Sequence, residues 1–128
     1  MDNENKIITL SFQYSIKNKK YTIEGKLKEK DKCNKIMLEL FKKLYEISNW
    51  TWKDLKNRPT NSGYETIPIS SFNVNFNSIK EELNLSNDSK IIIFRFCKQN
   101  YRILGVQRQD TLYIIGYDWD FSAYNHGS

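Results

Sequence analysis

The last third of the chain holds three segments rich in Ile, Phe and Tyr, and they restrict the fold more than any other feature of the sequence. They are Lys90–Cys97, Tyr101–Val106 and Thr111–Asp118, joined by connections of three and four residues. Such short connections join antiparallel neighbours, because a parallel pair needs a crossover of about a dozen residues or more. The sequence therefore predicts an antiparallel meander of three to four strands over residues 90–126, in which the aromatic ending is the place for a short fourth strand at the edge.

A helical hairpin is predicted over residues 31–57. Its longer helix runs from Asp31 to Ser48, where apolar residues recur at helical spacing: Ile36, Met37, Leu40, Phe41, Leu44 and Ile47. Thr51 and Asp54 resemble a capping box at the start of a second, short helix. That helix ends before Pro59, because proline interrupts a helix.

Residues 7–27 are predicted to form a basic β-hairpin. Two stretches alternate apolar and polar residues, Ile7–Tyr14 and Tyr21–Leu27. The polar stretch Lys17–Lys20 between them is typical of a turn.

The middle of the chain has weaker patterns. Ile67–Ile69 is expected to be an extended connection, and Ser78–Leu85 a short helix capped by Asn77. A chain of 128 residues without an internal repeat has room for one hydrophobic core. We therefore expect a single domain, residues 1–128, of the α+β class, with helices packed on an antiparallel sheet.

The net charge of +5 is concentrated in the first half of the chain. Residues 1–64 carry 14 Lys and Arg against 8 Asp and Glu, whereas residues 65–128 carry 6 against 7. Such a positive field favours a polyanionic partner, either nucleic acid or an acidic protein. The candidate RNA contacts are Lys17, Lys19 and Lys20 in the N-terminal segment, with Arg108 in the meander.

The expected location is the cytoplasm. Apolar runs such as Ile91–Phe94 are far shorter than the roughly 20 residues that span a bilayer, so we expect no membrane partner. No apolar leader follows Met1. Cys33 and Cys97 lack a C-x-x-C spacing, and we interpret both as packing thiols.

Arginines interrupt two neighbouring strands of the predicted meander, in Phe94-Arg95-Phe96 and Tyr101-Arg102-Ile103. An arginine in an apolar strand must reach solvent or find a partner, because its unpaired burial is very unfavourable. If the register places both on one face, two guanidinium groups form a surface suited to phosphate. The alternative is that each arginine pairs with a carboxylate such as Asp118 or Asp120.

The chain ending adds candidates for proton transfer. His126 is the only histidine, and an imidazole has an ordinary pKa near neutrality, which suits a general acid or base. Tyr124 is a second candidate if a nearby arginine lowers its pKa, and is otherwise a core aromatic. Asp118, Asp120 and His126 do not form a recognised metal motif, so we expect no metal.

The absence of certain motifs excludes several enzyme classes. The 5 glycines are scattered and no G-x-S-x-G sequence occurs, which excludes phosphate-loop nucleotide hydrolysis and serine hydrolysis. RNA cleavage is compatible with the chain, because the ribose 2′-hydroxyl is a built-in nucleophile. It needs only alignment, proton removal and cations beside the phosphate, so we expect no cofactor.

The order of a helical hairpin and this meander resembles the RelE-type toxin superfamily of small bacterial mRNA interferases. The matching strands read Phe94-Arg95-Phe96, Tyr101-Arg102-Ile103-Leu104-Gly105 and Leu112-Tyr113-Ile114-Ile115. Residues 36–126 are also similar to a group of uncharacterised small bacterial proteins. That group combines a Leu-x-x-Leu-x-x-Leu/Ile-Ser helix, matched by Phe41–Ser48, with an Arg-Ile-x-Gly strand and an Asp-x-x-His-x-x-Tyr ending. Phe121 stands where the group tends to have His.

The resemblance implies a RelE-like fold and ribosome-dependent cleavage of mRNA by a toxin with a cognate antitoxin protein. It assigns Arg95 and Arg102 to the phosphate and Tyr124 to acid or base catalysis, with His126 as its rival. Lys98 would be a peripheral phosphate contact. The N-terminal basic segment is not part of the usual toxin core, and we expect it to contact rRNA or a protein partner.

A second hypothesis is a non-catalytic module of a phage or mobile element that binds nucleic acid or a protein. Phe121 and the late position of the single histidine favour it. In this case Trp50, Trp52 and Trp119 would be anchors for a protein partner, if they are exposed.

Overall fold

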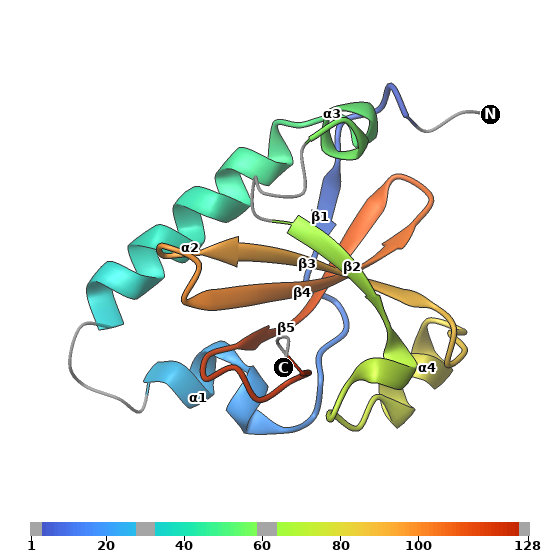
Figure 1. The fold of residues 1–128 in the computed structure, drawn as a ribbon. Helices are drawn as coiled ribbons and strands as arrows, with labels where there is room; N and C mark the ends of the chain where they lie inside the picture. The colour runs from blue at the N-terminus through green and yellow to red at the C-terminus, as the bar shows by residue number, and fades with distance from the viewer. Residues whose placement is uncertain (1–3, 28–32, 59–63, 126–128) are drawn as a thin grey trace.

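The predicted meander forms the middle of a five-stranded sheet (Figure 1), comprising β3 (Lys90–Phe96), β4 (Tyr101–Arg108) and β5 (Thr111–Asp118). β2 (Tyr64–Pro68) lies antiparallel to β3 at one edge, and β1 (Thr9–Ser11) lies parallel to β5 at the other. The strand order is therefore β1-β5-β4-β3-β2. The structure, a computed structural model, describes residues 4–27, 33–58 and 64–125. It confirms the α+β class, but the sheet is mixed rather than purely antiparallel.

The helical hairpin is confirmed as α2 (Cys33–Ser48) and α3 (Trp52–Lys56). The capping box is also present, because the Thr51 hydroxyl accepts a hydrogen bond from the Asp54 amide at 3.0 Å. The Thr51 amide in turn donates to the Asp54 carboxylate at 2.9 Å. These bonds satisfy the backbone amides of Thr51 and Asp54 at the start of the short helix.

Each face of the sheet carries its own core. On one face, α2 and α3 pack on alternate residues of β3, including Ile92, Phe94 and Phe96. On the other face, Ile91 and Ile93 pack under α4 (Asn77–Glu82) and the N-terminal segment. A strand buried on both faces has an uninterrupted apolar sequence, which explains the run of residues 91–94.

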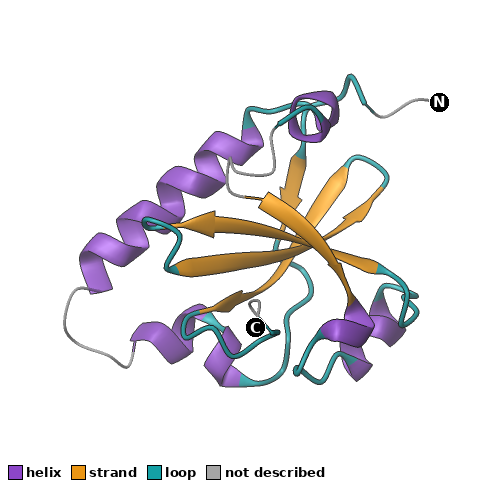
Figure 2. Ribbon diagram, in the orientation of Figure 1, coloured by secondary structure: helices purple, strands orange, loops and turns teal. Residues whose placement is uncertain are grey.

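The N-terminal β-hairpin predicted for residues 7–27 is wrong. After β1 the chain forms a 3-10 turn, η1 (Lys19–Tyr21), and a short helix, α1 (Ile23–Leu27), as Figure 2 shows. The polar residues that suggested a hairpin turn are helix caps. The Asn18 side chain accepts from the Lys20 amide at 3.0 Å, and the Thr22 hydroxyl accepts from the Gly25 amide at 3.2 Å.

The middle of the chain contains a strand that the sequence analysis described only as an extended connection. This strand, β2, ends at Pro68 on the sheet edge, where a residue without an N–H is tolerated. The short helix α4 is present, but its cap differs from the prediction. The Asn75 side chain, rather than Asn77, accepts a hydrogen bond, from the Asn77 amide at 2.9 Å.

Within the described residues the predicted meander has three strands, without the optional fourth strand in the ending. Up to Asn125, the described residues after Asp118 form a loop, whose strand-like pairing is one isolated bridge between Tyr124 and Phe72. The edge of β5 is occupied by β1 instead. An edge strand from the other end of the chain therefore completes the sheet.

Several other expectations concern single residues. The three tryptophans are buried, so their indoles belong to the core. Cys97 is a half-buried free thiol packed against the core, as expected, whereas the side chain of Cys33 lies outside the described residues. None of the described helices has both the length and the apolar character needed to cross a membrane.

Candidate functional site

A row of charged side chains crosses one end of the sheet. Arg95 on β3 lies directly opposite Arg102 on β4, and Arg102 lies opposite Asp118 on β5. Glu65 on β2 pairs with Ile93, which shares a face with Arg95 because alternate strand residues point the same way. The two arginines therefore share one face, as the sequence analysis considered, with a carboxylate at each end of the row.

Glu65 and Arg95 form the accessible part of this charged row. Arg95 Nη1 lies 3.9 Å from Glu65 Oε2, and these side chains are 19% and 35% exposed. Like charges opposite one another on a sheet repel, so two facing arginines require carboxylates nearby. The structure gives Arg95 an acidic partner, Glu65, which is not one of the two aspartates considered in the sequence analysis.

Arg102 is buried, with only 8% of its surface exposed. Its Nε donates to the Tyr124 hydroxyl at 3.3 Å, and its Nη1 donates to the Gln99 carbonyl at 2.6 Å. The Phe121 ring covers the guanidinium, with 4.8 Å between the ring centre and Cζ. Arg102 therefore connects the β3–β4 turn to the C-terminal loop rather than facing open solvent.

Tyr124 connects Arg102 to Glu65. Its hydroxyl donates to Glu65 Oε1 at 2.7 Å while accepting from Arg102, and the residue is 4% exposed. Burial is the main cause that raises the pKa of Tyr124 to about 12; the hydrogen bond to Glu65 also raises it, and the hydrogen bond from Arg102 lowers it. The net pKa shift is therefore upward although Arg102 acts in the opposite direction. This favours the alternative that Tyr124 is a core aromatic, and the phenol stays protonated.

Asp118 holds the loop that brings Tyr124 to the charged row. Its carboxylate is fully buried and accepts hydrogen bonds from the backbone amides of Ser122 at 3.1 Å and Ala123 at 3.2 Å. Phe121 has a φ of 63°, which turns the loop back over the sheet. Among the described residues no group of three or more His, Cys, Asp or Glu is placed to hold a metal ion, and His126 lies outside them.

The N-terminal lysines lie beside this C-terminal loop, although they are far from it in sequence. Lys20 Nζ is 3.7 Å from Asp120, and the Tyr21 hydroxyl lies 3.0 Å from Ser122 Oγ. Lys17, Lys19 and Lys20 are exposed, so this basic segment extends the surface next to the charged row.

The two remaining predicted RNA contacts differ in their surroundings. Lys98 is exposed in the β3–β4 turn, next to the charged row. Arg108, in contrast, donates from Nε and Nη2 to the Leu83 carbonyl at 3.2 and 2.9 Å, and from Nη2 to Asn84. These bonds satisfy carbonyls at the end of α4, so the structure gives Arg108 a role in the fold.

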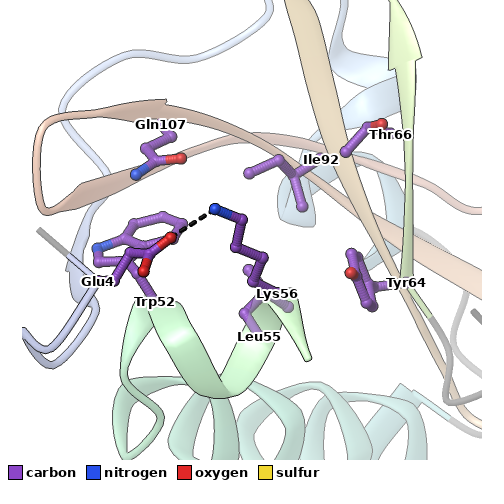
Figure 3. Close-up of a pocket in the computed structure, with 8 residues that line it drawn as sticks. All are labelled: Glu4, Trp52, Leu55, Lys56, Tyr64, Thr66, Ile92 and Gln107. Atoms are coloured by element: carbon purple, nitrogen blue, oxygen red, sulfur yellow. Dashed lines mark hydrogen bonds and ion pairs between the residues drawn. The ribbon is translucent and has the colours of Figure 1, made fainter. Parts of the chain in front are cut away.

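A separate pocket of about 260 Å³ lies on the opposite face of the sheet, between α3 and β2–β4 (Figure 3). Its walls are largely apolar, with Trp52, Leu55 and Ile92, and Glu4 and Lys56 point toward one another across it. None of the predicted site residues lines it. Its volume is below the roughly 300 Å³ at which small-molecule sites begin, so we assign it no ligand.

Glu65 is the functional candidate that sequence analysis missed. It was not considered because β2 was not predicted as a strand, and a carboxylate becomes a candidate only when its position beside Arg95 is known. Its place between Tyr64 and Ile67 in an alternating segment is the signal that points to a strand. No protein-family model matches the chain, and neither a curated protein nor a solved structure matches it.

Proposed function

We propose that the protein is a metal-independent endoribonuclease of the toxin type, which cleaves mRNA on the ribosome in a toxin–antitoxin pair. The observation that carries this proposal is Glu65, whose side chain is one-third exposed beside Arg95 and whose carboxylate accepts a hydrogen bond from the Tyr124 hydroxyl. The basic N-terminal segment and the resemblance of the meander to RelE-type toxins support mRNA as the substrate.

In this reaction Glu65 is the general base. Its carboxylate removes the proton of the ribose 2′-hydroxyl, the O2′–P bond forms, and the P–O5′ bond breaks. Water returns a proton to the leaving 5′ oxygen, so the products are a 2′,3′-cyclic phosphate and a 5′-hydroxyl. Arg95 binds the phosphate and stabilises the negative charge that develops on it.

Arg102 and Tyr124 then act as positioning residues instead of the catalytic roles implied by the resemblance. Both are buried, and Tyr124 directs its proton at Glu65. They fix the carboxylate in one orientation, as a general base requires. His126, which lies outside the described residues, is the alternative to water as the proton donor to the leaving oxygen.

The test is expression of the protein in a bacterial host, with growth measurement and mapping of mRNA 5′ ends. We expect growth arrest and new cleavage sites, and at least about 100-fold less cleavage by Glu65→Gln, since general base catalysis contributes that much. Glu81→Gln, at an exposed position on α4, is the matched control. Unchanged cleavage by folded Glu65→Gln would rule out this base.

The second candidate is a non-catalytic module that binds nucleic acid or a protein. The burial of Arg102 and Tyr124 favours it, because an enzyme commonly exposes such groups to its substrate. Normal growth and intact mRNA at confirmed expression would support this candidate and contradict the first.

A further inference from the structure

Helix α2 carries an apolar stripe on the side that faces solvent. Leu38, Phe41 and Tyr45 are 53%, 69% and 66% exposed, and their spacing of three and four residues places them on one face. Figure 1 shows α2 along the outside of the molecule. Its other side already packs on the sheet through Ile36, Leu40 and Ile47. A surface helix normally has a polar outer face, so this stripe is an unusual exposed surface.

We propose that this stripe binds the same stripe of a second copy, giving an antiparallel two-fold dimer. The two-fold axis crosses the helix pair. A residue a given number of positions before the axis in one copy therefore lies opposite the residue the same number of positions after the axis in the other copy. With the axis beside Phe41, the Phe41 rings meet each other, Leu38 lies opposite Leu44 of the partner subunit, and Tyr45 lies opposite Met37 of the partner subunit. Met37 and Leu44 border the stripe and are half-buried.

The charges beside the stripe also agree with this two-fold axis. Lys35, Glu39, Lys42 and Glu46 alternate in sign along one flank of α2. The antiparallel contact brings Lys35 within one residue, or about 1.5 Å along the helix, of the position opposite Glu46 of the partner subunit, and it brings Glu39 equally close to the position opposite Lys42 of the partner subunit. A parallel contact would instead place this charged flank beside the apolar flank of the partner subunit that carries Met37 and Leu44, where the charges meet no opposite charge.

The flank carries two lysines and two glutamates, so its net charge is zero, and this favours a second copy of the chain as the binding partner. RNA or an acidic protein would be attracted by the two lysines and repelled by the two glutamates, whereas a second copy satisfies all four. Within one copy, Lys42 already lies 3.6 Å from Glu39, and Lys43 lies 3.6 Å from Glu46. The dimer adds an equivalent pair across the interface without burying an unmatched charge.

Sedimentation of the full chain over a range of concentrations measures this dimer. We expect Phe41→Asp to raise the dimer dissociation constant at least about 30-fold, as for a central interface aromatic. Phe12→Asp is the control, because Phe12 is another exposed aromatic, 57% exposed, outside the stripe. A wild-type monomer at every concentration, or a dimer insensitive to Phe41→Asp, overturns the proposal.

A charge exchange tests the register. Lys35→Glu should weaken the dimer, and adding Glu46→Lys in the same chain should restore it, because both symmetric pairs are then reversed. Failure of the double variant to restore dimerisation overturns the antiparallel register.

Cysteine crosslinking gives an independent readout in a Cys33→Ser, Cys97→Ser background. Phe41→Cys should form a disulfide-linked dimer. Leu38→Cys should not, since about six residues of helix, or roughly 9 Å, separate it from its own copy. Crosslinking of both variants would indicate a parallel pair and contradict the proposal.

Discussion

The ionisation of two buried tyrosines, Tyr117 and Tyr124, makes the stability of the fold depend on pH. Burial raises the pKa of each phenol to about 12, so the folded state holds these protons more tightly than the unfolded chain. The stabilisation is therefore complete below about pH 10, the ordinary tyrosine value, and is lost as the pH rises toward 12.

We predict that the free energy of unfolding falls over this alkaline range by on the order of 2 kcal/mol for each of the two tyrosines. Urea denaturation at a series of pH values measures the fall. The free energy of unfolding of the Tyr124→Phe variant should fall only by the part that is due to Tyr117. An equal fall in the variant and the wild type would show that Tyr124 does not titrate as described.

The turn between β3 and β4 contains three successive residues in the left-handed region. Cys97, Lys98 and Gln99 have φ values of 54°, 57° and 69°. Side chains make this conformation unfavourable by roughly 1 kcal/mol per residue, whereas glycine adopts it freely. Arg102 compensates for part of this strain through its bond to the Gln99 carbonyl.

We predict that Gln99→Gly stabilises the protein by about 0.5 kcal/mol, after the entropy lost by glycine on folding is subtracted. Chemical denaturation measures the change. Gln107→Gly, within β4, is the matched control and should destabilise the protein, since a strand interior does not need glycine. Destabilisation by Gln99→Gly would mean that the turn is not strained.

The backbones of α1 and η1 approach each other closely at Gly25. A Cβ atom at Gly25 would lie 2.1 Å from the Lys19 carbonyl oxygen, which is backbone and cannot rotate away. Only glycine therefore permits α1 to pack at this distance from η1.

We predict that Gly25→Ala destabilises the protein by about 2 kcal/mol, as overpacking generally does. Thermal unfolding measures the loss, with the exposed neighbour Glu24→Ala as control. A Gly25→Ala variant as stable as the wild type would contradict the close packing of α1 on η1.

The elements that the sequence predicted correctly are those whose signals are local. Helix α2 follows from apolar spacing, α3 from the Thr51 and Asp54 box, and the meander from its short connections. The strand containing β1 was predicted but given the wrong partner, and β2 was missed as a strand; both pair with strands distant in sequence. Thr9 pairs with Thr111, for example, and the alternation of a segment does not identify such a partner.

At the scale of the whole molecule, folding brings the lysines of residues 17–20 to the loop that borders the charged row. A basic surface releases counterions when it binds RNA, so affinity depends on salt.

We predict that a triple Lys17→Ala, Lys19→Ala, Lys20→Ala variant binds single-stranded RNA more weakly. Its log–log slope of affinity against salt should be smaller in magnitude by about 2, at ~0.7 for each lost phosphate contact. Fluorescence anisotropy at several salt concentrations measures it. A control that replaces the exposed Lys6, Lys53 and Lys90 removes the same charge, and an equal effect there would show that no local site exists.

The sequence by itself determined the α+β class, the helical hairpin, the three central strands and the two candidate arginines, because helical spacing and short connections are local properties of the chain. The tertiary structure alone decided that Arg102 and Tyr124 are buried, that Glu65 faces Arg95, and that Arg108 binds the end of α4. Burial and the pKa of a side chain depend on neighbours from other strands. These neighbours are set by strand order and register, which the local pattern does not encode.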